Sequence, residues 1–334
     1  MEIDRDHARD VAVEAFREHG IRSGDARATA EMLVTAEARG KDSHGLIRLP
    51  RYLQGVNHGN VDPDGQIETT TDAGAAAAID GGTRLGPAVA RHGLEEATMR
   101  ADEHGVGLVG IHNSTHLGAL GYYTDRIRRA GYVGLAMTNT EPAMPPHGGS
   151  EPVLGTNPIA IGLPTDPPFN LDMSTSAIAR GSLERAAEEG ESIPEGVALD
   201  ADGEPTTDPN AALEGTTLPF GGAKGSGLAI AVEVLAGGLV GASMGDDVTG
   251  TYDTTEPCTK GDLFVAIDPD ATTDGSFGPE TDEFLASLKR LETPTGVDRV
   301  RVPGERSLTK ERTETIAVDD ELWSDVLELA SRSD

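Results

Sequence analysis

Cysteine, lysine and long apolar runs are scarce in this sequence of 334 residues, and each scarcity excludes a class of protein. The single cysteine, Cys258, excludes an internal disulfide and a metal site made of several thiolates. No apolar run approaches the ~20 residues of a membrane-spanning helix, so no membrane partner is expected. The N-terminal residues MEIDRDHARDVAVEAF are charged and amphipathic, unlike a secretory signal, which predicts a cytoplasmic protein.

Basic residues are also scarce. The 27 Lys and Arg are outnumbered by 57 acidic residues, which gives a formal net charge of −30. Phosphate backbones and anionic membranes repel such a chain, so no nucleic-acid partner is expected. High net charge also marks disordered chains, but here 37% of the residues are hydrophobic and they recur in periodic runs. The pattern resembles proteins of salt-accumulating halophiles; a surface that binds cations or basic partners is the alternative.

The hydrophobic pattern divides the chain into three regions. Up to about Tyr52 the apolar residues recur at helical spacing, and a third helix is predicted to begin near Ser43. In the middle region short strands alternate with helices, and the tail returns to helices at residues 283–291 and 319–331. Strands are predicted at residues 105–111, 133–137, 159–163 and 263–267, and helices at 119–129 and 228–239, the last of them buried on most faces.

This pattern predicts the α/β fold class, with helical N- and C-terminal parts that pack together around an inserted α/β domain. The predicted boundaries assign residues 1–73 plus 282–334 to the helical part and residues 74–281 to the α/β domain.

The segment Asp42-Ser43-His44-Gly45, followed by Arg48, is the first candidate site. If a helix begins here, His44 and Arg48 lie at positions i and i+4 on one face. A guanidinium binds the carboxylate of a 2-oxo or 2-hydroxy acid through a two-pronged hydrogen bond, and an imidazole exchanges the hydroxyl proton while hydride moves elsewhere. Ser43 can orient the imidazole. In the alternative interpretation, Asp42 or Ser43 caps a helix and His44 is a satisfied polar residue.

Two further segments carry candidate binding groups. His112-Asn-Ser-Thr-His116 follows a predicted strand and precedes a helix, where open α/β sheets bind ligands. The alternative is a metal site formed by His112, His116 and His147, although no Glu follows the first histidine. The glycine-rich run LPFGGAKGSG places Lys224 at a helix start and predicts an anion cradle, but it is neither a Walker loop nor a G-x-G-x-x-G fingerprint.

The order of these motifs along the chain resembles the malate/L-lactate dehydrogenase family, which includes L-sulfolactate, ureidoglycolate and 2,3-diketogulonate dehydrogenases or reductases and the cyclic-imine carboxylate reductases. The resemblance runs from about residue 5 to 315, through DSHG with Arg48, STHLGALGYY, PVLGTNPIAIGLP, DMSTSAIARG, IPEG…DADGEPTTDP, LPFGGAKGSGLA and VPGER. It implies the L-sulfolactate dehydrogenase-like fold, which is unrelated to the Rossmann fold, is usually dimeric and binds NAD or NADP through its own loops. Residues 74–281 would then be the cofactor-binding domain, and residues 1–73 plus 282–334 the dimerisation and catalytic part.

The resemblance also implies roles for individual residues. The family's acid–base histidine falls on His44, its relay serine on Ser43, its carboxylate-binding arginine on Arg48 and its substrate-contacting threonine on Thr156. No metal ion is implied. Cofactor contacts fall on His116, Leu117, Gly118, Ala119, Leu120, Ser174, Thr175, Ser176, Lys224, Gly225, Gly304, Glu305 and Arg306.

Two positions depart from the family pattern. In some relatives an aspartate shortly after an Arg-Gly pair completes the relay, whereas here Arg180-Gly181 is followed by Ser182, Leu183 and Glu184. That role is therefore unassigned or taken by Glu184. Ala223 stands where relatives often carry a larger polar residue, which leaves the choice between NAD and NADP open.

The predicted function is hydride transfer between NAD or NADP and a small 2-hydroxy or 2-oxo acid of the malate, lactate or sulfolactate type, carried out by a homodimer. Two alternatives stay open from the sequence. One is a metal-dependent hydrolase or lyase that uses His112, His116 and His147, and the other is a non-catalytic acidic binding module in which the glycine motifs are turns.

Overall fold

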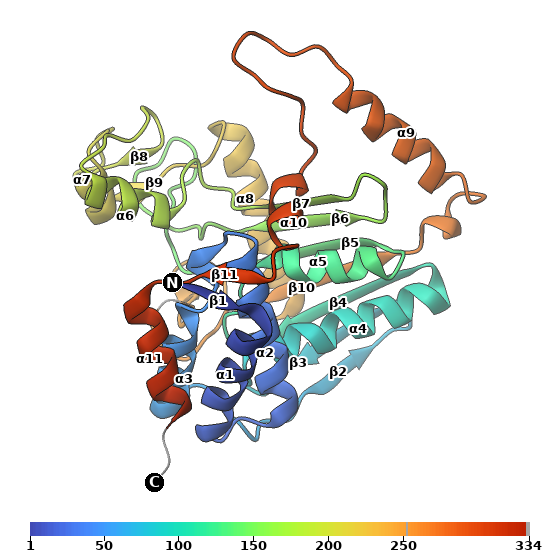
Figure 1. The fold of residues 1–334 in the computed structure, drawn as a ribbon, viewed down its shortest axis with the longest axis horizontal. Coiled ribbons are helices and arrows are strands. Elements are labelled where there is room, and N and C mark those ends of the chain that lie inside the picture. The colour runs from blue at the N-terminus through green and yellow to red at the C-terminus, as the bar shows by residue number, and fades with distance from the viewer. Residues whose placement is uncertain (252, 332–334) are drawn as a thin grey trace.

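The computed structural model describes residues 1–251 and 253–331, and within them a seven-stranded mixed sheet forms the centre of the fold (Figure 1). Of its neighbouring strand pairs, β3–β4 runs parallel and the others antiparallel, so the sheet is not the parallel sheet of a Rossmann fold. In spatial order the strands are β2 (Glu68–Asp72), β3 (Ala76–Asp80), β4 (Val106–His112), β10 (Asp262–Ile267), β5 (Val133–Thr138), β6 (Ile159–Leu163) and β7 (Phe169–Met173).

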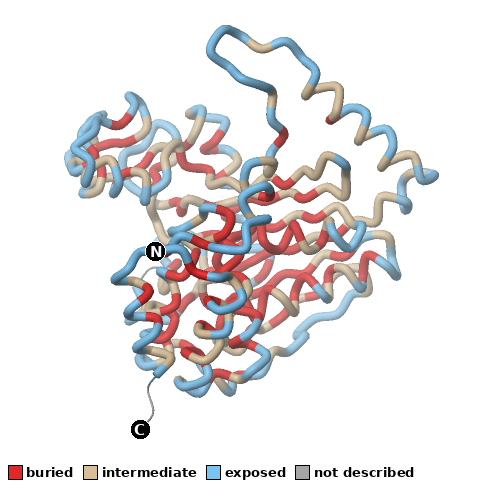
Figure 2. Tube along the Cα trace, in the orientation of Figure 1, coloured by how far each residue is buried: buried red, intermediate tan, exposed pale blue. Residues whose placement is uncertain are grey.

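Helices cover both faces of this sheet. Side chains alternate between the faces along a strand, and on β4 Gly107 lies against α4 while Gly110 lies against Val240 on the opposite face. The helix α4 (Gly86–His104) is the crossover that joins the parallel pair, and α5 (Leu120–Arg129) packs beside it on β5 and β6. The buried residues gather between these helices and the central strands (Figure 2). The α/β fold class is therefore confirmed.

The two ends of the chain pack together, as predicted. The strand β1 (Glu2–Asp4) pairs antiparallel with β11 (Thr315–Ala317), and α11 (Asp320–Ala330) packs against the N-terminal helices (Figure 1). Asp319 caps α11 by accepting hydrogen bonds from the backbone N–H groups of Glu321 and Leu322. The N-terminal helices are α1 (Arg5–Glu18), α2 (Ser23–Ala38) and α3 (Arg48–His58).

A small lobe lies beside one end of the sheet (Figure 1). It has its own core of Leu183, Ile193, Ala198 and Ala212, separate from the main core. The lobe contains α6 (Arg180–Glu189), β8 (Ala198–Leu199), α7 (Pro209–Glu214) and β9 (Thr216–Thr217). The remaining described elements are α8 (Ala223–Ala236), α9 (Phe277–Lys289), α10 (Glu305–Lys310) and four 3₁₀ turns, η1 (Asp42–His44), η2 (Gly238–Val240), η3 (Gly245–Asp247) and η4 (Pro269–Ala271).

The apolar helix α8 differs from its prediction. Its outer face is exposed rather than buried, with 44% of Ile230 and 52% of Val234 open to solvent. Leu239, in the 3₁₀ turn that follows the helix, is 58% exposed. The reason is its place in the fold, because it covers β5 and β10 from outside and nothing in the described chain packs on its other side. By length and composition alone, Ala223–Val240 is also long and apolar enough to cross a membrane, contrary to the sequence prediction; 44% of the stretch is buried within the protein.

Candidate active site

His44 lies in the 3₁₀ turn η1, not in a helix that continues to Arg48. The prediction of a helix beginning near Ser43 is wrong, because α3 begins only at Arg48 and Gly45 interrupts the helical backbone between them with ψ −147°. The two side chains are nevertheless joined through Ser43. Its hydroxyl lies 2.9 Å from His44 Nδ1, and Arg48 Nε donates a hydrogen bond to its carbonyl oxygen at 2.6 Å. The predicted trio therefore forms one cluster.

The last turn of α2 holds this segment in place. Glu37 accepts a hydrogen bond from the Leu46 backbone N–H at 2.8 Å, and a Cβ on Gly45 would overlap the same carboxylate oxygen. Gly45 is thus required by the close approach of Glu37, which no local sequence motif reveals. Burial raises the pKa of the Glu37 carboxyl to about 7, although the Leu46 N–H opposes the shift, and the charge of Asp42 adds to it.

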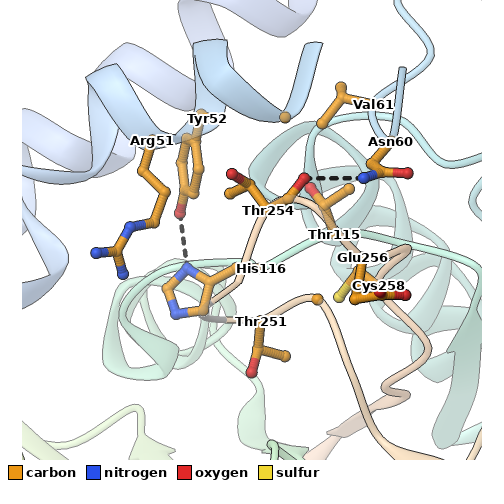
Figure 3. Close-up of a pocket in the computed structure, with 12 residues that line it drawn as sticks. Arg51, Tyr52, Asn60, Val61, Thr115, His116, Thr251, Thr254, Glu256 and Cys258 are labelled. Carbon is orange, nitrogen blue, oxygen red and sulfur yellow. Dashed lines mark hydrogen bonds between the residues drawn. The ribbon is translucent and has the colours of Figure 1, made fainter. Parts of the chain in front are cut away.

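A second imidazole lies beside His44. The His116 ring centroid is 5.8 Å from that of His44, with the planes tilted by 33°. His116 comes from the loop between β4 and α5, and its Nδ1 lies 2.8 Å from the hydroxyl of Tyr52 on α3 (Figure 3). The structure therefore brings the predicted His116 to the predicted His44. The sequence analysis missed Tyr52, which is 64 residues away along the chain.

Burial and nearby cations keep both imidazoles neutral. Burial is the largest cause that lowers the pKa of His44, to about 4; the charge of Arg48 lowers it further, Asp172 raises it and Lys41 lowers it. Burial likewise lowers the pKa of His116 well below its usual value, and the charge of Arg48 again adds to this effect. An imidazole with a low pKa is an uncharged proton acceptor at neutral pH.

The carboxylate whose charge raises the pKa of His44 is that of Asp172, near the end of β7. Asp172 Oδ2 also pairs with Lys41 Nζ at 2.9 Å. The sequence analysis noted Asp172 only as the first residue of DMSTS. Glu184, the predicted stand-in for the relay aspartate, pairs instead with Arg180 at 3.2 Å on the surface of α6. The relay role of Glu184 stays a prediction.

Thr156, which is predicted to contact the substrate, and the predicted cofactor segment Ser174–Ser176 lie in one continuous wall. Thr175 donates twice to the carbonyl oxygen of Thr156, from its backbone N–H at 2.8 Å and its hydroxyl at 2.9 Å. The Thr175 carbonyl accepts the N–H of Phe220 at 3.0 Å, in the glycine-rich run that leads to Lys224. A Cβ on Gly225 would overlap the Phe220 carbonyl, so this glycine allows α8 to start against the wall.

The predicted contacts Gly304, Glu305 and Arg306 lie on the other side of β7. Gly304 adopts φ +88° and packs against Asn170, two residues before Asp172 in the sequence. Glu305 pairs with Lys289 at 3.1 Å, and Arg306 is exposed. The structure thus joins this segment to the strand that carries Asp172, but it does not bring Glu305 to His44.

The three histidines of the metal alternative have separate surroundings. His112 Nε2 lies 3.8 Å from Asp80, His116 is bonded to Tyr52, and His147 lies beside Gly222. In residues 1–251 and 253–331, no group of three His, Cys, Asp or Glu side chains is arranged to hold a metal ion. The predicted grouping of His112, His116 and His147 is wrong, because the loop after β4 turns the first two histidines toward different elements.

An open pocket lies next to His116, between α3 and the later residues Gly250, Thr251, Thr254, Glu256 and Cys258 (Figure 3). Its described lining includes Arg51, Asn60, Thr115 and Cys258. Burial raises the pKa of the Cys258 thiol to about 11, so the thiol stays protonated and unreactive at neutral pH. The sequence analysis did not anticipate this pocket, because its walls come from three distant segments.

The chain is similar to known proteins over nearly its whole length. The profile of the malate/L-lactate dehydrogenase family matches residues 3–327. The chain is 43% identical to the malate/(S)-sulfolactate dehydrogenase of Methanothermus fervidus, over 99% of this chain and 97% of that protein. It is 40% identical to the (2R)-3-sulfolactate dehydrogenase (NADP(+)) of Chromohalobacter salexigens, over 94% and 95%. The solved sulfolactate dehydrogenase from Methanocaldococcus jannaschii superposes with a TM-score of 0.94 at 39% identity, covering 98% of this chain and 96% of that one.

Proposed function

Since the chain belongs to the malate/L-lactate dehydrogenase family, we propose that Ser43, His44 and Arg48 are the catalytic cluster of this NAD- or NADP-dependent 2-hydroxy acid dehydrogenase. One observation carries the proposal: the Ser43 hydroxyl contacts His44, and the Ser43 carbonyl accepts from Arg48. A guanidinium that can bind the substrate carboxylate therefore lies beside an imidazole that can accept a proton, as oxidation of a 2-hydroxy acid requires.

The part of this wall formed by Ser174–Ser176 and Lys224 fits an anionic dinucleotide, whereas Thr156 beside it is proposed to contact the substrate. The dinucleotide part supplies hydroxyl groups, the backbone N–H groups at the start of α8 and one ammonium group, and Gly225 keeps side-chain bulk away from that helix start. We assign cofactor binding to this part of the wall together with His116–Leu120. The nicotinamide supplies or accepts the hydride when it is bound. We also propose that Gly304–Arg306 contact the cofactor.

His44 then handles the proton of the substrate hydroxyl. To accept it at Nε2, the neutral ring must carry its hydrogen on Nδ1. The Nδ1–H then donates a hydrogen bond to Ser43 Oγ, 2.9 Å away. Arg48 holds the substrate carboxylate. This binding also offsets the positive charge that lowers the pKa of His44, so the ring becomes a stronger base when the acid is bound. Asp172 favours the imidazolium that forms.

We propose a substrate with a second acidic group, of the malate or sulfolactate type. The named relatives act on such acids, and Arg51, one turn after Arg48 on α3, adds positive potential at His116. The test is an assay of 2-oxo acids of the malate, lactate and sulfolactate types with NADH and with NADPH, at low salt and in molar KCl. Equal kcat/KM for acids with and without the second acidic group would contradict this substrate class.

We also propose that the homodimer pairs through α8, which lies outside the part predicted to carry dimerisation, residues 1–73 plus 282–334. The exposed apolar strip consists of Ile230 and Val234, one turn apart on α8, and Leu239 in the following turn η2. The acid on this helix, Glu233, is buried. In a chain of net charge −30, such a strip lets a second copy approach without bringing carboxylates together. We therefore propose that a second copy of this chain covers the strip.

The domain division and the cytoplasmic location remain predictions. Pairing of β1 with β11 supports a helical part made of residues 1–73 and 282–334. The strand β2 (Glu68–Asp72) lies before the predicted boundary yet pairs with β3, so the sheet extends slightly beyond residues 74–281.

A further inference from the structure

Two hydrogen-bond donors converge on Nδ1 of His116. The Tyr52 hydroxyl lies 2.8 Å from this nitrogen, and the backbone N–H of Gly118 points to it at 3.3 Å. A backbone N–H can only donate, so Nδ1 must present its lone pair. The hydrogen of the neutral ring is therefore on Nε2, and the Tyr52 hydroxyl also acts as a donor.

From this geometry we infer that Tyr52 is a positioning residue that fixes His116 as the neutral Nε2–H tautomer and directs that donor into the active site. Tyr52 is 5% exposed and stands one turn after Arg48 on α3. A buried tyrosine hydroxyl needs a partner, and here the partner is His116. The helix that carries the carboxylate-binding arginine therefore also orients the second imidazole (Figure 3).

The electrostatic surroundings support the uncharged form of His116. Burial is the largest cause that lowers the pKa of His116. The charges of Arg48 and Arg51 on α3 and of Lys260 before β10 lower it further, as does His44 in η1 when it is protonated. A protonated ring would also turn an Nδ1–H toward the Gly118 N–H, which is repulsive. The ring is held neutral from several directions at once.

Two neighbouring imidazoles then have opposite hydrogen-bonding characters. His44 offers a lone pair at Nε2 and His116 offers an N–H at Nε2, with ring centroids 5.8 Å apart. A ligand oxygen near both would meet one acceptor and one donor. The donor suits a carbonyl oxygen, either of the 2-oxo acid or of the nicotinamide carboxamide. This catalytic consequence rests on the proposed role of His44, whereas the tautomer of His116 does not.

The test uses Tyr52→Phe, which keeps the ring and removes the hydroxyl. Tyr122→Phe is the matched control, since it removes a buried tyrosine hydroxyl that contacts Arg126 on α5. Protein labelled with ¹⁵N-histidine is examined by imidazole NMR across the neutral pH range, and the His116 signals are assigned with His116→Gln. This readout needs no substrate or turnover, so it stands apart from the proposed dehydrogenase mechanism.

We expect His116 of the wild-type protein to be a non-titrating Nε2–H ring. In Tyr52→Phe its Nδ1 signal should shift and kcat/KM should fall on the order of 10- to 100-fold, while Tyr122→Phe changes neither. A larger effect on NADH affinity assigns the donor to the carboxamide, and a larger effect on kcat assigns it to the 2-oxo oxygen. A hydrogen on Nδ1 in the wild type, or unchanged His116 signals in Tyr52→Phe, would overturn the inference.

Discussion

The carboxylate of Glu37 lies directly against Gly45, and the same oxygen accepts the N–H of Leu46 at 2.8 Å. This contact ties the end of α2 to the residue that follows His44. The position of the proposed acid–base group therefore depends on a glycine and a glutamate that touch no substrate.

Replacing Gly45 with alanine should destabilise the protein and lower its activity. The new Cβ would overlap Glu37, so either the carboxylate leaves Leu46 or the His44 turn shifts. We expect a loss of about 1–3 kcal/mol in the free energy of unfolding, measured by denaturant titration, together with a lower kcat. Gly24→Ala is the control, because no atom lies within 4 Å of a Cβ there. Equal stability of the two variants would contradict this role of Gly45.

Stability should also respond to the ionisation of Glu37. Because burial raises the pKa of this carboxyl to about 7, the folded state binds the proton more tightly than the unfolded chain does. The contribution of Glu37 to stability is therefore full below its unfolded pKa and is lost as pH rises to about 7. Glu37→Gln can still accept from Leu46 without carrying a charge. It should gain on the order of 1 kcal/mol relative to wild type at about pH 8 and little at about pH 5, in thermal melts. A pH-independent difference would argue against the raised pKa.

His44→Ala should lose kcat by on the order of 10²- to 10⁴-fold, because no neighbouring side chain replaces the proton acceptor. Binding of NADH, followed by fluorescence titration, should be retained. His92→Ala on α4 provides a histidine control away from the site. Near-normal turnover of the His44 variant would remove this residue from the proposed mechanism.

Arg48→Lys should mainly raise KM for the 2-oxo acid. A lysine ammonium is a point charge and cannot reproduce the two parallel hydrogen bonds of a guanidinium. The lysine also cannot keep the geometry of the bond from Nε to the Ser43 carbonyl. Steady-state kinetics should show KM for the acid about tenfold higher, with a smaller change in KM for the cofactor. An unchanged KM for the acid would count against binding of the substrate carboxylate by Arg48.

Val234→Asp should convert the proposed dimer into a monomer. The change puts a carboxylate in the middle of the apolar strip on α8, where 52% of Val234 is exposed. Phe284→Asp on α9 is the matched control, because Phe284 is also exposed but lies on another helix. Sedimentation velocity gives the mass of each variant. A wild-type monomer, or a Val234→Asp dimer, would refute pairing through this helix.

Elements with continuous apolar runs were predictable from the sequence. The strands β4, β5, β6 and β10 fall within a residue of their predicted ranges, because apolar residues occupy both of their faces. The strand β2, ETTTD, was missed because all five of its residues are exposed and leave no hydrophobic signal. The helix α9 begins at Phe277 rather than near residue 283, since its apolar positions contact little of the core.

The site was predictable only where chemistry is carried by local motifs. DSHG with Arg48 and STHLG identified His44, Arg48 and His116, and the structure brings all three together. Tyr52, Glu37 and the Lys41–Asp172 pair were not assigned roles at the site, because each acts through a contact that the fold creates. The exposed strip on α8 was missed for the same reason: an apolar sequence does not reveal which of its sides is covered.

The pairing of β1 with β11 has a consequence for the order in which the enzyme matures. Residues 2–4 are synthesised about three hundred residues before their partner strand, residues 315–317. Helices α1 and α3 contact α11, so they too lack part of their packing on the ribosome. The proposed catalytic turn lies between these helices in the sequence. A nascent chain would therefore complete the packing around this turn only after residues 315–330 have been translated.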